Sequence, residues 1–266
     1  MNMYLHELKS LRKSTLIWTC ALIALAVIYF SVYPGIVNDA SDFTKLLSAY
    51  PAPVRAALGI SLDNITSILG FYSMVFSFIT LCGAIQAMNL GVSILSKEAR
   101  ERTADFLLVK PVSRPAIVSA KLLAALTMLL ATNVLYYAAA SMLANMVKTA
   151  DYSVRVFFLI NLTLFFLQLM FLAIGLVISV FFTKLKSVLP ISLGIVFGLY
   201  IIGAIIATGK NDAARFISPF KYFDITYIIK NASFEAQYLI AGAVIVLTAI
   251  AASYVIYAKK DIHAVS

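Results

Sequence analysis

Cysteine and histidine are scarce in this sequence of 266 residues, which contains two of each. Cys20 and Cys82 each lie inside an apolar run, so they provide neither a disulfide framework nor the spacing of a metal site, and packing is their expected role. His6 and His263 lie near opposite ends of the chain, which excludes a metal site or a catalytic triad built on histidine. We therefore expect no metal site and no catalytic residues.

Charged residues are also few. Asp, Glu, Lys and Arg make up 12% of the chain, whereas about a quarter of a soluble domain is charged. Hydrophobic residues make up 62%, and the mean hydropathy is +0.95. A bilayer core about 30 Å thick needs about 20 apolar residues for each helical crossing, and stretches of that kind occupy most of the chain. The composition predicts an all-α integral membrane protein.

The formal net charge of +9 could suggest a nucleic-acid partner. Proteins that bind nucleic acid gather their basic residues on one soluble face, but here most Lys and Arg residues lie in short connections between apolar runs. That distribution is typical of membrane topology and of contact with anionic lipid headgroups. We expect membrane lipid, and no nucleic acid, as a partner.

Six apolar runs predict six transmembrane helices in a single membrane domain, residues 1–266, with no repeat and no long linker. The first run is long and should remain as a helix rather than be cleaved as a signal peptide. Residues 38–66 and 209–235 are interpreted as external loops; Pro51 and Pro53 divide the first of these into two short amphipathic pieces at the interface. The predicted spans are about 15–37, 68–95, 117–147, 156–182, 188–208 and 236–258.

Six spans place both termini on the same side of the membrane. The connections on that side, together with the termini, carry thirteen Lys and Arg residues, and the connections on the other side carry eight. Because positive residues are enriched in cytoplasmic loops, we predict a cell-membrane protein with both termini in the cytoplasm.

No catalytic or nucleotide-binding motif is present in the sequence. The nearest string to a phosphate-binding loop, Gly209-Lys210-Asn211, lacks both the earlier glycine and the hydroxyl residue. The predicted span interiors have no Asp, Glu, Lys or Arg at mid-depth, which disfavours a carrier coupled to protons or sodium. The chain is not expected to be an enzyme, and any ATP that drives transport must be bound by another polypeptide.

The predicted spans contain amide side chains in place of charges. Such amides usually form hydrogen bonds between helices, and a polar translocation path is the alternative interpretation. Glycines at 175, 194, 198 and 203 permit close helix approach, either within the chain or in a dimer. The amide residues are Gln86, Asn89, Asn133, Asn161 and Gln168.

The most charged stretch of the chain lies between the second and third spans, in residues 96–116. Acidic and basic residues alternate through Asp105, so this run can continue the second span as a solvated helix. An apolar patch from Phe106 to Val109 follows, and Pro111 then ends the helical conformation. A short helix with an exposed apolar end indicates a docking element.

This segment resembles the signature of type-2 ABC transporter permeases. The matching residues are Glu98, Glu101, Thr103, Leu107, Leu108, Pro111, Val112, Ser113 and Arg114, with Lys121 in the place of the lysine that opens the next helix. Arg102 departs from the pattern, because many members have glycine there. Residues 1–14 resemble the cytoplasmic interface helix of the family, residues 50–60 its first external loop, and residues 218–224 a motif before its last span.

The resemblance implies the permease subunit of a bacterial ATP-driven exporter, with no cofactor in this chain and with ATP and Mg bound by a partner ATPase. Two permease chains, identical or homologous, would each dock one ATPase subunit through residues 1–14 and 96–116. The family suggests amphipathic peptides, antibiotics, other hydrophobic compounds or lipid-linked glycans as substrates. The competing interpretation is an ATP-independent channel, a secondary carrier or a membrane scaffold. The residues expected to couple the two subunits are Glu98, Glu101, Thr103, Phe106, Leu107 and Arg114.

Overall fold

Six long apolar helices form the protein in the computed structural model, which describes residues 3–57, 60, 65–100, 113–182, 187–209 and 212–259. Each helix is long and apolar enough to cross a membrane. The predicted all-α fold with six spans is therefore confirmed. The helices are α1 (Met3–Asn38), α4 (Ile68–Arg100), α6 (Arg114–Val147), α7 (Val154–Phe181), α8 (Leu189–Thr208) and α10 (Ala236–Lys259).

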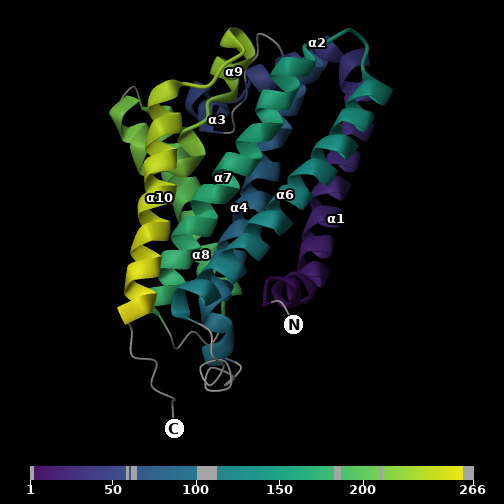
Figure 1. The fold of residues 1–266 in the computed structure, drawn as a ribbon. Coiled ribbons are helices and arrows are strands. Elements are labelled where there is room, and N and C mark those ends of the chain that lie inside the picture. The colour runs from purple at the N-terminus through teal and green to yellow at the C-terminus, as the bar shows by residue number, and fades with distance from the viewer. Residues whose placement is uncertain are drawn as a thin grey trace.

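Among the residues that the structure describes, five short helices lie in the connections that follow α1 and α8, on one side of the bundle. The start of α1 and the last turn of α10 lie at the other end, which we call the termini end; the end with the short helices is called the opposite end (Figure 1). Two short helices follow α1, as predicted, and three lie between α8 and α10. They are α2 (Ala40–Ser48), α3 (Ala52–Ala57), η2 (Asp212–Ile217), η3 (Pro219–Lys221) and α9 (Ile225–Asn231).

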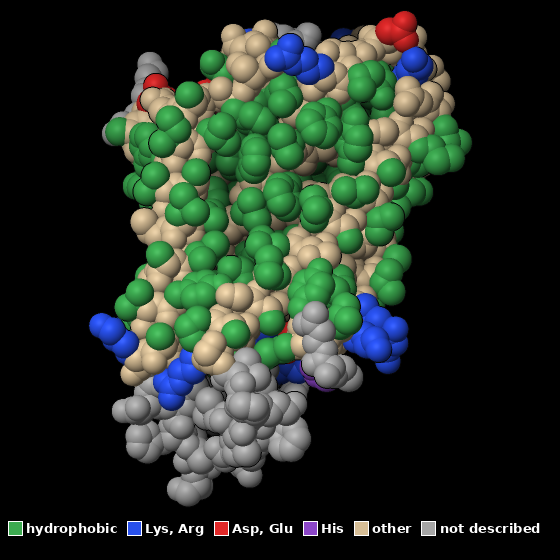
Figure 2. Space-filling model, viewed as in Figure 1, with side chains coloured by type: hydrophobic (Ala, Val, Ile, Leu, Met, Phe, Trp, Pro, Cys, Tyr) green, Lys and Arg blue, Asp and Glu red, His purple; other side chains and the backbone are tan. Residues whose placement is uncertain are grey.

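The surface between the two ends is apolar. Figure 2 shows a broad band of hydrophobic side chains over the middle of the bundle, with Lys and Arg gathered at its two ends. Large apolar side chains such as Ile17, Leu130 and Leu247 are more than half exposed. In water this exposure would be unfavourable, whereas in a bilayer the same side chains face lipid.

Residues 3–14 are helical, but they do not form a separate helix. They are the first turns of α1, which continues through the whole first span and contains 36 residues. At 1.5 Å per residue such a helix is about 54 Å long, well beyond the roughly 30 Å thickness of a hydrocarbon core. The predicted coupling segment is helical as far as Arg100, where α4 ends, and residues 101–112 lie outside the described part of the chain.

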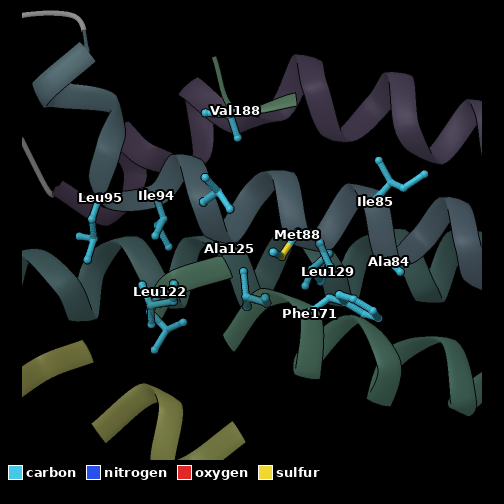
Figure 3. Packing of buried hydrophobic residues seen from close by; sticks show 14 of the residues in the cluster. Ala84, Ile85, Met88, Ile94, Leu95, Leu122, Ala125, Leu129, Phe171 and Val188 are labelled. Carbon is cyan, nitrogen blue, oxygen red and sulfur yellow. The ribbon is translucent and has the colours of Figure 1, made fainter. Parts of the chain in front are cut away.

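The core of the bundle is the packing of α4 against α7, with α1 packed along α6. Glycines let the backbones of α4 and α7 come close: a Cβ on Gly91 would collide with the carbonyl oxygen of Leu172, and one on Gly175 would lie 2.8 Å from the carbonyl oxygen of Met88. Apolar side chains from α4, α6 and α7 fill the adjoining space (Figure 3). These include Met88, Ala125, Leu129 and Phe171.

The other three glycines that the sequence suggests for close helix approach differ in their surroundings. Gly203 on α8 faces Ser218, whose Oγ would lie 2.8 Å from an added Cβ. Gly194 and Gly198 have no atom of the described chain within 4 Å of an added Cβ. Packing within the chain therefore accounts for Gly175 and Gly203 but not for the Gly194–Gly198 pair, and a dimer contact at that pair remains a prediction.

Part of the chain between α8 and α10, residues 212–224, returns into the bundle, and we call it the returning segment. The hydroxyl of Ser218 donates a hydrogen bond of 2.8 Å to the carbonyl oxygen of Leu199, near the middle of α8. The ring of Phe220 lies 5.2 Å from that of Phe171 on α7 and 5.3 Å from that of Tyr200 on α8. Residues 218–220, which the sequence places in an external loop, thus lie between the middle parts of two spans.

Arg215 holds this returning segment in position. Its Nη1 and Nη2 atoms donate to the carboxylate of Glu235 at 3.2 and 2.6 Å, and its Nε donates to the carbonyl oxygen of Lys221 at 3.1 Å. The guanidinium also lies over the ring of Tyr238, 4.1 Å from its centroid. Because Glu235 directly precedes α10, these contacts tie the returning segment to the start of the last span.

Candidate functional site

The termini end of the bundle carries the predicted coupling segment. Arg114, the first residue of α6, is the one predicted coupling residue whose side chain is described; its Nη1 donates to the carbonyl oxygen of Ala258 on α10 at 3.4 Å. Pro115 follows in the first turn, where its missing N–H leaves no hydrogen bond unmade. The side chain of Glu98 and all of Glu101, Thr103, Phe106 and Leu107 lie outside the described residues.

A buried ion pair joins α1 to α6 beside this segment. The Nζ of Lys121 lies 3.4 Å from the Oε1 of Glu7, and their side chains are 1% and 11% exposed. The same Nζ donates to the carbonyl oxygen of Ile94 on α4 at 2.9 Å. The sequence predicts Lys121 at the start of the third span. It does not reveal Glu7 as the partner, because the two residues are far apart along the chain and no local pattern connects them.

Two further hydrogen bonds connect the same helices. Lys97, on the extension of α4 beyond the predicted span, donates from Nζ to the Oγ of Ser10 on α1. The hydroxyl of Tyr4 on α1 lies 3.0 Å from that of Thr127 on α6. The first turns of α1 are therefore linked by side chains to the end of α4, where the coupling segment begins, and to the first half of α6.

The amides of the spans form a hydrogen-bond network at the centre of the bundle. Fully buried Gln168 accepts from the Nδ2 of Asn133 at 2.6 Å and donates to the Oε1 of Gln86 at 3.0 Å. Gln86 in turn donates to the Oγ1 of Thr132 at 3.2 Å, and this hydroxyl lies 3.0 Å from that of Thr19. The network thus includes side chains from α1, α4, α6 and α7.

Asn161 belongs to a second polar group nearer the opposite end. The Tyr72 hydroxyl donates to the Oδ1 of Asn161 at 2.8 Å and lies 3.0 Å from the hydroxyl of Tyr136. Because Tyr72 has a single hydroxyl proton, Tyr136 donates to Tyr72. Asn89 is half-buried and joins neither group in the described structure. Four of the five candidate amides therefore make hydrogen bonds between helices, which favours packing as their role; a translocation path remains a prediction.

A cavity of about 380 Å³ lies between α4, α7, α8 and the returning segment. Its wall carries a row of hydroxyl side chains, and three of them are spaced three and four residues apart on α4, so they share one helix face. The hydroxyl residues in the wall are Ser73, Ser77 and Thr80 on α4, Thr163 on α7, Tyr200 on α8 and Thr226 on α9.

Charged side chains of the returning segment line the same cavity. Arg215 is held by Glu235, and Asp224 caps α9 by accepting from the backbone N–H groups of Thr226 and Tyr227. Asp212 is a second carboxylate in the wall. No carboxylate of the described residues forms an ion pair with Lys221, which is half-buried. Burial lowers the pKa of Lys221; Asp224 opposes this lowering and Arg215 adds to it.

The sequence does not point to this cavity. Lys221 lies in a polar stretch with a proline, the usual composition of an exposed loop. The serines and threonines are single polar residues in apolar runs, and only their spacing on α4 could have indicated a shared face. No group of three or more His, Cys, Asp or Glu side chains that could hold a metal ion occurs among the residues that the structure describes.

Six crossing helices with an apolar outer surface and a hydrogen-bonded polar centre define a multi-pass integral membrane protein. A family model described as "ABC-2 family transporter protein" matches residues 1–262. The chain therefore belongs to this family and is a permease of the ABC-2 type, which confirms the resemblance seen in the sequence. No curated protein matches the sequence.

Proposed function

We propose that this chain is the membrane-spanning subunit of an ATP-driven exporter, which moves an amphipathic or hydrophobic substrate out of the cell. ATP and Mg would be bound by two copies of a separate ATPase subunit, and the permease would act as a pair of identical or homologous chains. Both termini would lie in the cytoplasm of a cell whose plasma membrane contains the protein. The family match and the absence of a nucleotide-binding loop from the sequence support this proposal.

The observation that carries the proposal is the set of side-chain links around the predicted coupling segment. A force applied to residues 96–116 would reach α1 through Lys97 and Ser10, and α6 through Lys121. It would reach α10 through Arg114. Because α4 is tightly packed against α7, closure of the ATPases would tilt the helices together, as a rigid-body switch between a closed and an outward-open state.

Affinity purification of the tagged chain in mild detergent, followed by mass spectrometry and an ATPase assay, tests this function. We expect a P-loop ATPase to purify with the wild-type chain. We expect the Glu98→Ala/Leu107→Ala double variant to insert normally but to lose this ATPase and the transport that depends on it, because it lacks both a charge and a buried apolar contact at the docking surface.

The matched control is the Asp42→Ala/Leu46→Ala double variant. It removes the same kinds of side chain from exposed positions on α2, at the opposite end of the bundle, and should retain the ATPase. Wild-type transport by the Glu98→Ala/Leu107→Ala variant would refute docking through the coupling segment. A pure preparation without a P-loop ATPase would favour a channel, a secondary carrier or a scaffold.

A further inference from the structure

We infer that the cavity between α4, α7, α8 and the returning segment binds the headgroup of an amphiphile in which an acidic phosphate lies beside hydrogen-bond donors, as in ethanolamine phosphate. Binding of such a ligand in the cavity does not depend on the proposed export function. That the ligand is a transported substrate does rest on that function. The inference follows from the depth of the cavity, its cation and its hydrogen-bonding capacity.

The depth of the cavity makes an amphiphile the natural occupant. The returning segment beside the cavity touches the middle of α8 through Ser218 and the middle of α7 through Phe220. Leu167 and Phe220 supply an apolar part of the wall. A ligand here would keep its chain among apolar side chains while its polar end meets the hydroxyls, and the volume is within the range of about 300–1,000 Å³ that is usual for ligand sites.

Lys221 supplies the positive charge. An ionisable side chain at membrane depth is expensive and normally has a functional partner, yet no described carboxylate pairs with Lys221. The other cation in the wall, Arg215, already forms two hydrogen bonds to Glu235. A phosphate is a suitable counterion, because the lysine ammonium is a common ligand of phosphate groups in proteins.

The hydroxyl row on α4 and α7 requires donors on the ligand. Ser73, Ser77, Thr80 and Thr163 each donate to a carbonyl oxygen of their own helix, at 2.7 to 3.3 Å. A hydroxyl whose proton is already used can only accept a further hydrogen bond. Four acceptors therefore face a ligand together with Lys221, and Asp212 and Asp224 add two carboxylates.

This combination discriminates between ligand classes. A purely cationic ligand would leave Lys221 without a counterion. A purely anionic ligand would face the carboxylates of Asp212 and Asp224 and leave the hydroxyl acceptors without donors. A phosphate next to an ammonium or to hydroxyl groups satisfies both sides of the cavity. Phosphocholine is the informative contrast, because it carries the phosphate and a positive charge but has no N–H donor.

The test is a lipid titration of the purified full-length chain without its ATPase, followed by native mass spectrometry. The probes are lysophosphatidylethanolamine and lysophosphatidylcholine with the same acyl chain. We expect the ethanolamine lipid to bind about tenfold more tightly or better, the usual scale for lost hydrogen bonds to a charged group. Equal binding of the two lipids would overturn the inference.

Variants separate the cation from the hydroxyls. Lys221→Met should abolish binding of the ethanolamine lipid, Lys221→Arg should restore it, and Lys230→Met, which removes an exposed lysine of α9 outside the cavity, should leave it unchanged. Thr163→Val keeps the side-chain shape and should reduce the preference for ethanolamine over choline. Unchanged binding by Lys221→Met would refute the site.

Competition with free O-phosphoethanolamine distinguishes the source of the headgroup. If this soluble compound displaces the lipid, the headgroup alone is sufficient and a free ligand can occupy the cavity. If only the intact lipid binds, the acyl chain contributes and the ligand comes from the bilayer. Because the assay contains no ATPase, failure of lipid binding would leave the proposed exporter function intact, and loss of ATPase docking would leave this inference intact.

Discussion

Gln168 links three helices through one side chain. It lies on α7, accepts from Asn133 on α6 and donates to Gln86 on α4, and its Nε2 also lies 3.4 Å from the carbonyl oxygen of Gly83. In a membrane interior an amide without partners would be strongly unfavourable, because lipid supplies no hydrogen bonds. The network therefore restricts the relative rotation of the three helices as well as contributing to stability.

We predict that Gln168→Leu lowers the free energy of unfolding by about 1–2 kcal/mol, since hydrogen bonds between membrane helices contribute about 0.6 kcal/mol on average and at most about 1.7. Unfolding of the purified protein by SDS titration measures this loss. Asn145→Leu is the control, because Asn145 is exposed and bonds only to its own helix in the described structure. Equal stability of the two variants would contradict a structural role for the network.

The buried pair of Glu7 and Lys121 gives a sharper prediction at the residue scale. Lys121→Met should lower stability by about 3–5 kcal/mol, because it leaves a buried carboxylate without its counterion. The double variant Glu7→Leu/Lys121→Met should recover much of this loss, since no unpaired charge remains. SDS unfolding of both variants checks the difference. A double variant that is less stable than Lys121→Met would show that Glu7 has another important partner.

At the scale of elements, the approach of α4 to α7 depends on positions where a side chain has no space. Gly91 lies against the backbone of α7, and Gly175 lies against the backbone of α4. A backbone cannot move aside as the end of a flexible side chain can. By contrast, Gly194 on α8 faces open space.

Gly91→Ala should therefore destabilise the bundle by about 1–3 kcal/mol, the usual range for overpacking of a well-packed core. Gly194→Ala should be neutral or slightly stabilising in the isolated chain, because alanine favours the helix by about 1 kcal/mol over glycine. Thermal unfolding in detergent, followed by gel filtration, compares the two variants. A similar loss in both would show that helix packing at Gly91 has more freedom than the structure indicates.

At the scale of the whole molecule, the sequence predicts the number and type of the spans well. Hydropathy alone placed the starts and ends of α7, α8 and α10 within about two residues, because an apolar run of bilayer length has few alternative structures. The family resemblance depended on residues 98–114, whose charges and proline form a local pattern, and on the order and spacing of the matching residues 1–14, 50–60 and 218–224. Features written in local sequence were therefore predictable.

Features that depend on contacts between distant parts of the chain could not be predicted from the sequence. Lys221 has the sequence context of a loop, and the contacts of Ser218 with Leu199 and of Phe220 with Tyr200 are what place this part of the chain beside the middle of α8. The pairing of Glu7 with Lys121 likewise requires the fold of α1 along α6. Gln86 and Gln168 were identifiable as polar residues in spans, but their partners depend on helix rotation, which hydropathy does not specify.

The last helix connects two regions that lie far apart. Near the termini end, α10 accepts the hydrogen bond from Arg114, and at its start Glu235 holds the arginine of the cavity wall. A displacement of α10 would therefore alter the shape of the cavity, and a molecule in the cavity would resist that displacement. Thermodynamic linkage requires the two effects to be equal in free energy. A partner that docks beside Arg114 and shifts α10 would change the affinity of the cavity for its ligand by some factor. Binding of the ligand in the cavity would change the affinity for that partner by the same factor.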